Sequence, residues 1–453
     1  MRNAINLLLI CCCATTAFGR DESTRDFSKT VALAAGRSFR IEHSLGNVNI
    51  HTHPRGEVEL HASIRCSAAT PSEARDCTNQ IKITVEESAS GVRVRTEYPQ
   101  TSFFNGRRGL SYSVNYDITM PETAPLEVRN QYGEVSVADL HAASVIHNTN
   151  GRVSFQRGRG AQRIENSYAE VEVQNNEGDV TVVNTNGSVG TTDITGAADI
   201  HNRYAEVRAT NVGKRLDLNC GNCSVVVSSV GGAANITNTF GPVTVRDARA
   251  DVVVQNQNGK VEAMGVTGAA DLRTSYDGVR FSRIGKGLTV RAANSNVTGD
   301  TVGESAEVET SYGSIDLRGV KGGARASANN SSIRLTDIGG EIYARTSYAG
   351  VQIEESAGPV TVENGNGSVT VRMKATQRCQ PISINTSYSP IRVTVPRGAG
   401  YNLTARTSYG RITSQPEMAV SGQIGGDSLS GKIAGGGCDL RLIDQNGNID
   451  ILN

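Results

Sequence analysis

Residues 164–189 read IENSYAEVEVQNNEGDVTVVNTNGSV, and this stretch decides how the rest of the chain is interpreted. Tyr168 and Asn186 stand 18 residues apart, and each is followed three residues later by a valine. Between them apolar and polar residues alternate, as in Val171-Glu172-Val173, which is typical of a strand with one buried and one wetted face. The stretch therefore predicts short strands that are separated by turns and repeat every 18 residues.

The same position recurs in fourteen consecutive units, and aromatic residues alternate there with asparagine. These fourteen residues, which define what we name the reference slot, are Tyr132, Asn150, Tyr168, Asn186, Tyr204, Asn222, Phe240, Asn258, Tyr276, Asn294, Tyr312, Asn330, Tyr348 and Asn366. Every unit has a β-branched residue three positions after the slot and an apolar residue four positions before it. One unit cannot bury its apolar face alone, so the repetition predicts a stacked array.

The predicted fold is all-β, a parallel β-solenoid (β-helix-like) of 18-residue two-strand units. Stacked coils rise about 4.8 Å each, so the residues of one slot form a ladder. Strict alternation of aromatic residues and asparagine leaves open a 36-residue coil, in which like residues would stack. Asn-Gly pairs at Asn150, Asn186, Asn258 and Asn366 also signal antiparallel hairpins. Tyr168-Ala169 would resist the positive φ of such turns, which favours the solenoid.

Four segments are expected along the chain: a signal peptide at 1–19, an all-β N-terminal cap region at 20–127, the repeat array at 128–414 and a C-terminal capping segment at 415–453. The cap is expected to cover the first coil and block edge-to-edge association. Its strands are predicted at 39–50, 58–66, 81–86, 92–97 and 112–120, with a helix at 72–79 and an exposed loop at 100–110. The Gly/Ser-rich residues 415–438 are expected to form a loop or an atypical cap.

The signal peptide is predicted from Met1-Arg2-Asn3, a short apolar run and small residues before a cleavage site after Gly19. No later segment approaches the ~20 apolar residues that a membrane helix needs, so no transmembrane segment is predicted in the mature chain. An exported protein is therefore expected, periplasmic, secreted or on the cell surface. Lys+Arg and Asp+Glu are 45 each and do not gather in blocks, which argues against a nucleic-acid partner.

Six cysteines follow the signal peptide, and an even count in an exported chain favours disulfides. Proximity favours three pairs among 15 possible connectivities. The favoured pairs are Cys66 with Cys77, Cys220 with Cys223, and Cys379 with Cys438. Cys220-Gly221-Asn222-Cys223 resembles a redox dithiol, but no βαβ unit surrounds it, and we interpret it as a clip across one turn.

Residues that could perform chemistry do not form a recognisable set. His51 and His53 share one side of a predicted strand, with His43 and His61 nearby, but no Cys, Asp or Glu at suitable spacing completes a metal site. We interpret them as solvated strand histidines and predict no metal and no cofactor. The outward column that follows the β-branched slot mixes charges and residue types, unlike the clustered carboxylates of polysaccharide lyases and hydrolases. An enzyme is therefore not predicted.

An export signal, a leading all-β segment that reaches YDITMP at 116–121, and many Gly-Xaa-Val-Xaa-Val units together resemble a bacterial family of exported β-strand-repeat, adhesin-like proteins of unknown function. The resemblance covers roughly residues 40–415, its motifs are low in information, and no functional residues transfer. It implies a non-enzymatic envelope or surface protein. We predict an adhesin-like scaffold that binds a polysaccharide or a surface protein along its repeat face. The alternatives are a carbohydrate-active β-helix enzyme, in either the lyase or the hydrolase class, and a passive structural spacer.

Overall fold

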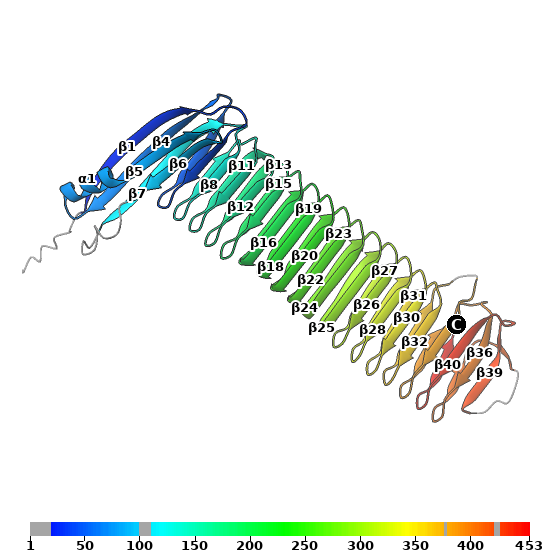
Figure 1. The fold of residues 1–453 in the computed structure, drawn as a ribbon. Coiled ribbons are helices and arrows are strands. Elements are labelled where there is room, and N and C mark those ends of the chain that lie inside the picture. Colours follow the sequence, from blue (N-terminus) through cyan, green and yellow to red (C-terminus); the bar gives the residue numbers. More distant parts are fainter. Residues whose placement is uncertain (1–19, 99–109, 376–377, 421–425) are drawn as a thin grey trace, which may run out of the picture. The chain divides into compact units, whose positions relative to one another are not determined.

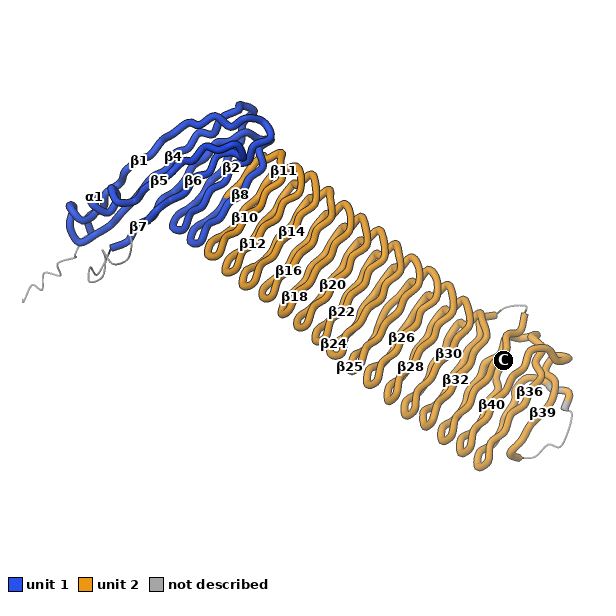
Figure 2. Tube along the Cα trace, in the orientation of Figure 1, with its two compact units in different colours: residues 1–135 blue, residues 136–453 orange. Residues whose placement is uncertain are grey.

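The computed structural model describes residues 20–98, 110–375, 378–420 and 426–453 (Figure 1). The chain divides into two compact units, residues 1–135 and 136–453 (Figure 2). The predicted signal peptide and residues 100–109 of the predicted loop lie outside the described residues. Among the described residues, α1 (Pro71–Gln80) is the one helix, and no helix is long and apolar enough to span a bilayer.

From Ser144 to Met373 the coils of the second unit close after 18 residues, because strands pair in parallel with the strands one unit further along. Ile164 lies opposite Val182, and Val171 lies opposite Val189. The predicted parallel β-solenoid of 18-residue units is thereby confirmed. The 36-residue coil and the antiparallel hairpins are both wrong, because neighbouring strands are one unit apart and run in the same direction. Aromatic residues and asparagines consequently share one ladder.

Two parallel sheets make up the coil, and the reference slot lies in the turn that leads from the first to the second. The first sheet contains β10 (Ser144–His147), β12 (Gln162–Glu165), β14 (Val180–Val183), β16 (Ala198–Tyr204), β18 (Leu216–Asn222), β20 (Ala234–Phe240), β22 (Val252–Asn258), β26 (Ala306–Thr310), β28 (Ala324–Ala328), β30 (Ile342–Thr346), β32 (Val360–Asn364), β34 (Ile382–Asn385), β40 (Cys438–Ile443) and β36 (Tyr401–Arg406). The second sheet contains β11 (Val153–Arg159), β13 (Val171–Glu177), β15 (Val189–Ile194), β17 (Val207–Val212), β19 (Val225–Val230), β21 (Val243–Ala248), β23 (Val261–Val266), β27 (Ile315–Val320), β29 (Ile333–Ile338), β31 (Val351–Ser356), β33 (Val369–Met373), β35 (Ile391–Thr394), β41 (Ile449–Leu452) and β37 (Ile412–Ser414). The strands β24 (Ala270–Ile284) and β25 (Leu288–Val302) continue through the turn and belong to both sheets.

A left-handed backbone position recurs seven residues after the reference slot, and it was not predicted from the sequence pattern. It is held by Asp139, Arg157, Asn175, Asp193, Asn211, Ser229, Asp247, Gly265, Arg283, Thr301, Gly319, Asp337 and Glu355. Asn, Asp and Gly tolerate positive φ best and hold most of these places. The residue at this position shifts the alternation of buried and exposed side chains by one. Ala209, two residues before Asn211, is buried, and so is Val212, directly after Asn211. Each coil thus turns a corner without losing its apolar interior.

The last coils do not stack in sequence order. The coil of β34 and β35 pairs with β40 and β41, and those strands pair in turn with β36 and β37. The final strands of the chain therefore lie between two coils that precede them in sequence. Beyond them, β39 (Ser428–Ile433) pairs antiparallel with β36, and β38 (Met418–Val420) pairs antiparallel with β39. The residues expected to form a loop or cap thus supply an antiparallel end.

The first unit combines long antiparallel strands with short parallel ones. β4 (Glu57–Ala68) pairs antiparallel with both β1 (Asp21–Ala32) and β7 (Ser111–Pro121), and β5 (Lys82–Ser88) forms an antiparallel hairpin with β6 (Gly91–Glu97). The predicted helix is present as α1, capped by Thr70, whose Oγ1 accepts a hydrogen bond from the Glu73 backbone N–H. The strand β1 was not predicted. β9 (Val135–Ala138) begins at the last residue of this unit.

One further coil, in the first unit, escaped the sequence analysis. The single strand predicted at 39–50 is two strands, β2 (Ser38–Glu42) and β3 (Val48–His53). β2 pairs in parallel with β8 (Leu126–Arg129), which places Ile41 opposite Val128, and an isolated bridge places Leu45 opposite Tyr132. Leu45 therefore occupies a reference slot, and the repeat pattern begins before its first recognisable aromatic residue.

Candidate functional site

The turn that carries the reference slot forms one continuous row of exposed rings in the second unit. Tyr204 lies opposite Asn222, and Asn222 lies opposite Phe240, so the alternation seen in the sequence is an alternation in space. The exposed fraction of the ring residues ranges from 40% at Tyr204 to 85% at Tyr409. The exposed rings of this unit are Tyr168, Tyr204, Phe240, Tyr276, Tyr312, Tyr348, Tyr388 and Tyr409.

The alternation continues through the reordered coils at the C-terminal end. Asn446 belongs to the inserted coil and donates from its backbone N–H to Ser387 O at 3.0 Å, while Tyr409 N–H donates to Gln445 O at 3.0 Å. Asn446 thus lies between Tyr388 and Tyr409, although it follows both in sequence. We name these eight rings, together with the asparagines between them, the aromatic edge. Its asparagines are Asn186, Asn222, Asn258, Asn294, Asn330, Asn366 and Asn446.

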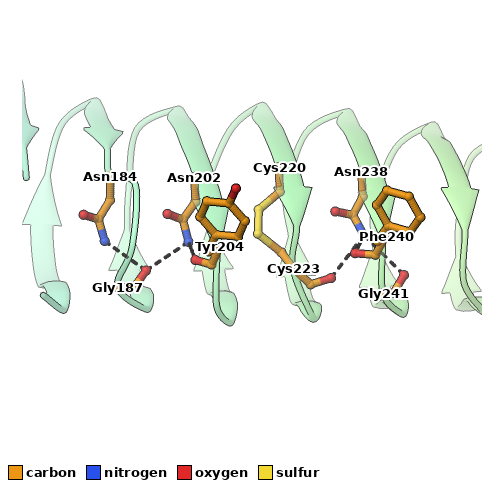
Figure 3. Close-up of a disulfide and its surroundings, with 9 residues drawn as sticks. All are labelled: Asn184, Gly187, Asn202, Tyr204, Cys220, Cys223, Asn238, Phe240 and Gly241. Atoms are coloured by element: carbon orange, nitrogen blue, oxygen red, sulfur yellow. Dashed lines mark hydrogen bonds between the residues drawn. A yellow bond between two sulfur atoms is a disulfide. The ribbon is translucent and has the colours of Figure 1, made fainter. Parts of the chain in front are cut away.

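Consecutive rings of the aromatic edge are two coils apart, which is about 9.6 Å. Aromatic rings in contact have centroids about 4.5–7 Å apart, so each ring stands alone over its own turn. Figure 3 shows this for Tyr204 and Phe240, which lie alike on their rungs and do not reach each other. Fourteen coil steps separate Tyr168 from Tyr409, which gives a row of about 67 Å. The edge therefore presents separate ring surfaces at a constant interval.

A buried polar ladder fixes the turns on which the rings stand. Its members occupy the position two residues before the reference slot, which we name the anchor slot. Asn202 donates from Nδ2 to Gly187 O at 3.0 Å and to Tyr204 O at 2.6 Å (Figure 3). Thr274 Oγ1 lies 2.9 Å from Gly259 O and 3.0 Å from Tyr276 O, in the same arrangement. Each anchor thus ties its own turn to the preceding one.

Buried anchors recur along the unit, and the sequence analysis did not assign them this role. They include Asn148, Asn166, Asn184, Asn202, Asn238, Asn256, Thr274, Thr310, Thr346, Asn364, Thr386 and Thr407. Their donors satisfy backbone carbonyls that would otherwise be buried without partners. The recurrence of Asn or Thr two residues before the slot was the available signal. The anchors hold the rings on a rigid backbone.

The Cys220–Cys223 disulfide replaces one anchor. Cys220 occupies the anchor slot and Cys223 follows the reference slot, and both side chains are buried. The neighbouring anchor Asn238 donates to Cys223 O at 3.1 Å, so the ladder continues past the disulfide (Figure 3). This placement is that of a structural clip across a turn. The other disulfides join the pairs that proximity favoured, Cys66–Cys77 and Cys379–Cys438.

Uncharged small residues surround the rings in the C-terminal half of the edge. From Tyr276 to Asn366, the residue before each reference slot and the two after it are Ser, Gly, Ala or Asn, except for Asp277. Several turns also require glycine: a Cβ at Gly367 would lie 1.9 Å from Ala349 O. Ala205, by contrast, adopts φ +76 without being glycine, whereas Tyr204 before it is not in the left-handed region. The rings therefore project above a low, neutral surface.

A second feature is a groove of about 660 Å³ on the first sheet. Asp271, Glu307, Arg325 and Tyr343 contribute to its lining. The Arg325 guanidinium lies 4.3 Å from the centroid of the Tyr343 ring, and Arg273 Nη2 donates to Asp271 Oδ2 at 2.8 Å. Carboxylates, a cation and a ring thus share one face of the array.

The histidines of the first unit differ from the sequence interpretation at two places. His43 is only 6% exposed, so its description as a solvated strand histidine is wrong. Its Nδ1 lies 3.1 Å from Thr96 Oγ1 and 3.2 Å from Tyr98 Oη, and burial lowers the pKa of His43 to about 4. Thr96 Oγ1 also lies 2.6 Å from Tyr116 Oη, and burial raises the pKa of Tyr116 to about 12. The cluster is therefore a neutral polar network in the core.

The acids that seemed to be missing beside His53 are present. Because β4 follows β3 after a short turn, the ligand atoms of His53, Glu57 and Glu59 lie within 4.8 Å of one another. Arg55 already lies among them: its guanidinium is 3.3 Å from Glu57 Oε1 and 2.5 Å from Glu59 Oε1, and its backbone N–H donates to His53 Nδ1 at 3.1 Å. The cluster is therefore an ion-paired turn. His51 and His61 are exposed, as expected.

Comparison with known proteins gives one family match. The Toastrack DUF4097 model matches residues 37–452. A crystal structure of a "putative cell adhesion protein" from Clostridium sporogenes ATCC 15579 is 9% identical, covers 95% of this chain and 99% of that chain, and has a TM-score of 0.16. A "putative adhesin" from Parabacteroides distasonis ATCC 8503 is 10% identical, covers 67% of this chain and 97% of that chain, and has a TM-score of 0.23. Similarities this weak do not bear on function. No curated protein matches the chain.

Proposed function

We propose that this chain, which belongs to the Toastrack DUF4097 family, is a non-enzymatic exported protein of the cell envelope or surface that binds a polymer or another protein along its repeat array. One observation carries the proposal: eight exposed rings stand at equal intervals on one edge of the second unit. Scattered exposed apolar residues are ordinary, whereas an organised set of exposed rings is typical of a binding surface. The protein is thus an adhesin-like scaffold.

Export is supported by the disulfides. Within the described residues there are three, one in the first unit and two in the second. Disulfides persist in oxidising compartments and are rare in the cytosol. Together with the predicted signal peptide, they favour a periplasmic, secreted or surface location.

The rigidity of the aromatic edge supports binding by a preformed surface. The anchors join successive turns through bonds such as Asn256 Nδ2 to Gly241 O at 2.9 Å. A surface that is fixed before binding loses little conformational entropy when a partner arrives. Many weak contacts at equal intervals then add up to firm attachment through multivalency.

The test is binding of the mature chain, residues 20–453, to intact bacterial cells and to isolated envelope material. A variant with Tyr276, Tyr312 and Tyr348 changed to Ser should lose most of the binding. The control is Tyr343→Ser, which removes a ring from the groove on the first sheet and leaves the edge intact. If the unmodified chain does not bind, the passive structural spacer is the remaining interpretation of the scaffold. Equal binding by all three proteins would remove the aromatic edge from the proposal.

The groove supports a second candidate, a carbohydrate-active enzyme, because Asp271 and Glu307 line it together. Paired carboxylates are the usual catalysts of glycoside hydrolysis. Incubation with plant and bacterial polysaccharides, followed by a reducing-end assay, tests this candidate. Product release that disappears in Glu307→Gln would replace the scaffold proposal. No release by the unmodified chain would eliminate the enzyme.

A further inference from the structure

The interval of the aromatic edge matches a chemical repeat. Its rings recur every second coil, at about 9.6 Å. In an extended β-1,4-linked glycan each sugar is turned over relative to the one before it, so the same face recurs once per disaccharide. The length of that disaccharide is close to two coils. A chain laid along the edge would therefore meet a ring with the same sugar face each time.

We infer that the aromatic edge binds one extended chain of an uncharged β-1,4-linked polysaccharide, with one ring stacked on each successive disaccharide. The inference rests on the proposed function and adds its ligand. The C–H face of a pyranose packs on an aromatic ring, and aromatic contacts of this kind favour binding beyond the area they bury. Seven of the eight rings are tyrosines, whose hydroxyls also hydrogen-bond sugar hydroxyls.

The asparagines fit the sugars between the rings. Asn294 and Asn330 flank Tyr312 by one coil on each side and are exposed. An asparagine amide offers two donors and an acceptor, which can pair with the equatorial hydroxyls at the edge of the intervening sugar. The alternation of ring and amide therefore gives each disaccharide one stacking surface and one hydrogen-bonding group.

Other polymers fit the edge less well. A polyanion, including a nucleic acid, requires Lys and Arg, but from Tyr276 to Asn366 the one charged residue beside the slots is Asp277. A peptide that adds a strand requires unpaired backbone groups. Backbone groups of this edge are already engaged between coils, as in Asn366 N–H to Ser347 O at 2.8 Å. A neutral glycan requires neither cations nor free backbone.

The experiment measures binding of the mature chain to cellohexaose and chitohexaose by titration calorimetry. Each contains three β-linked disaccharides, and maltohexaose is the ligand control because its α-linkages coil the chain. We expect binding of at least one β-linked hexasaccharide and none of maltohexaose. Affinity should fall roughly tenfold for each disaccharide removed, the effect of losing one stacked ring. Failure to bind either β-linked glycan, or equal binding of maltohexaose, would overturn the inference.

A position swap tests the interval itself. The double variant Tyr312→Asn/Asn330→Tyr keeps the number of rings, the composition and the charge but moves one ring by one coil. Both residue types already occupy this slot throughout the array, so the fold should tolerate the exchange, which circular dichroism checks. We expect the swap to weaken binding roughly tenfold, as much as Tyr312→Asn alone, while Thr298→Asn, at an exposed position of β25 outside the groove, leaves it unchanged. If the swap variant bound the glycan as tightly as the unmodified chain, the proposed match between the ring interval and the disaccharide length would be refuted.

The cell-binding assay distinguishes failure of the glycan inference from failure of the proposed function. Attachment to cells that is retained by the swap variant and is not competed by either β-linked hexasaccharide would overturn the glycan inference and leave the scaffold standing. Sedimentation of the same proteins detects a second copy of the chain as the occupant. Ring variants that abolish self-association without any change in glycan binding would likewise overturn the inference.

Discussion

The anchor slot provides a stringent test of how the array is held together. Asn256 is 4% exposed, and its Nδ2 donates to Gly241 O at 2.9 Å and to Gly259 O at 3.0 Å. Replacement by Thr keeps one donor, as at Thr274, and should destabilise the protein by about 1 kcal/mol. Replacement by Ala leaves both carbonyls without this donor and should cost about 2 kcal/mol. Asn256→Asp places a carboxylate against two carbonyl oxygens and should cost about 4 kcal/mol at pH 7.

Urea unfolding followed by far-ultraviolet circular dichroism measures these differences, with wild type as the reference at each pH. At a pH of about 4.5 the buried carboxyl of the Asn256→Asp variant should be protonated and donate one hydrogen bond, so the cost of that substitution should fall to about that of Asn256→Thr. Asn294→Asp, on the exposed reference slot, is the matched control and should change stability by less than about 0.5 kcal/mol. Equal costs for Asn256→Asp and Asn256→Ala at pH 7, or a large cost at Asn294, would refute the bridging role of the anchors.

Three further predictions follow from burial, charge and backbone conformation. Val279→Asp buries an unpaired charge and should destabilise the protein by several kcal/mol in thermal unfolding. Arg280→Asp, on the exposed face of the same strand, should change stability very little. Equal shifts in melting temperature would contradict the assignment of Val279 to the buried face and Arg280 to the exposed face. His43 has a pKa of about 4 in the folded protein, below the ordinary 6.5, so the unfolded state binds the proton at a higher pH than the folded state does. The free energy of unfolding should therefore drop by about 3 kcal/mol as pH falls from 6.5 to 4. The same dependence of stability on pH in His43→Gln would assign the loss to other groups. Thr301 has φ 59, so Thr301→Gly should raise the free energy of unfolding in urea by about 1 kcal/mol. Thr298→Gly, in ordinary strand backbone, should lower it. A change of the same sign in both variants would exclude backbone strain at Thr301.

The parts of the fold that the sequence predicted are those encoded by recurrence at a fixed interval. Tyr168, Asn186 and the valines that follow them repeat a local pattern, and a stack of coils is the direct consequence of such repetition. The coil of β2 and β3 was missed because Leu45 replaces the aromatic residue and a long insertion separates it from Tyr132. The order of the last coils was missed because strand pairing is not local. The alternation of Tyr388, Asn446 and Tyr409 holds only in the observed order.

The candidate site was predicted as a set of residues but not as a surface. The interpretation of a 36-residue coil placed rings on rings, whereas the observed coil leaves an asparagine between them and every ring exposed. The anchor role of Asn202 and Asn238 was not predicted, because burial of a polar side chain cannot be read from its residue type. The left-handed position cannot be predicted at Arg157 or Thr301, because neither residue type favours positive φ.

β40 and β41 lie between two coils that precede them in sequence, so they join the coil of β36 and β37 to the rest of the stack. Residues 401–414 are synthesised before residues 438–453, yet they reach the stack only across them. In a nascent chain that coil therefore cannot pair with the stack until residues 438–453 have been synthesised. Loss of residues 438–453 would remove β40 and β41 and leave the coil of β36 and β37 without its link to the stack.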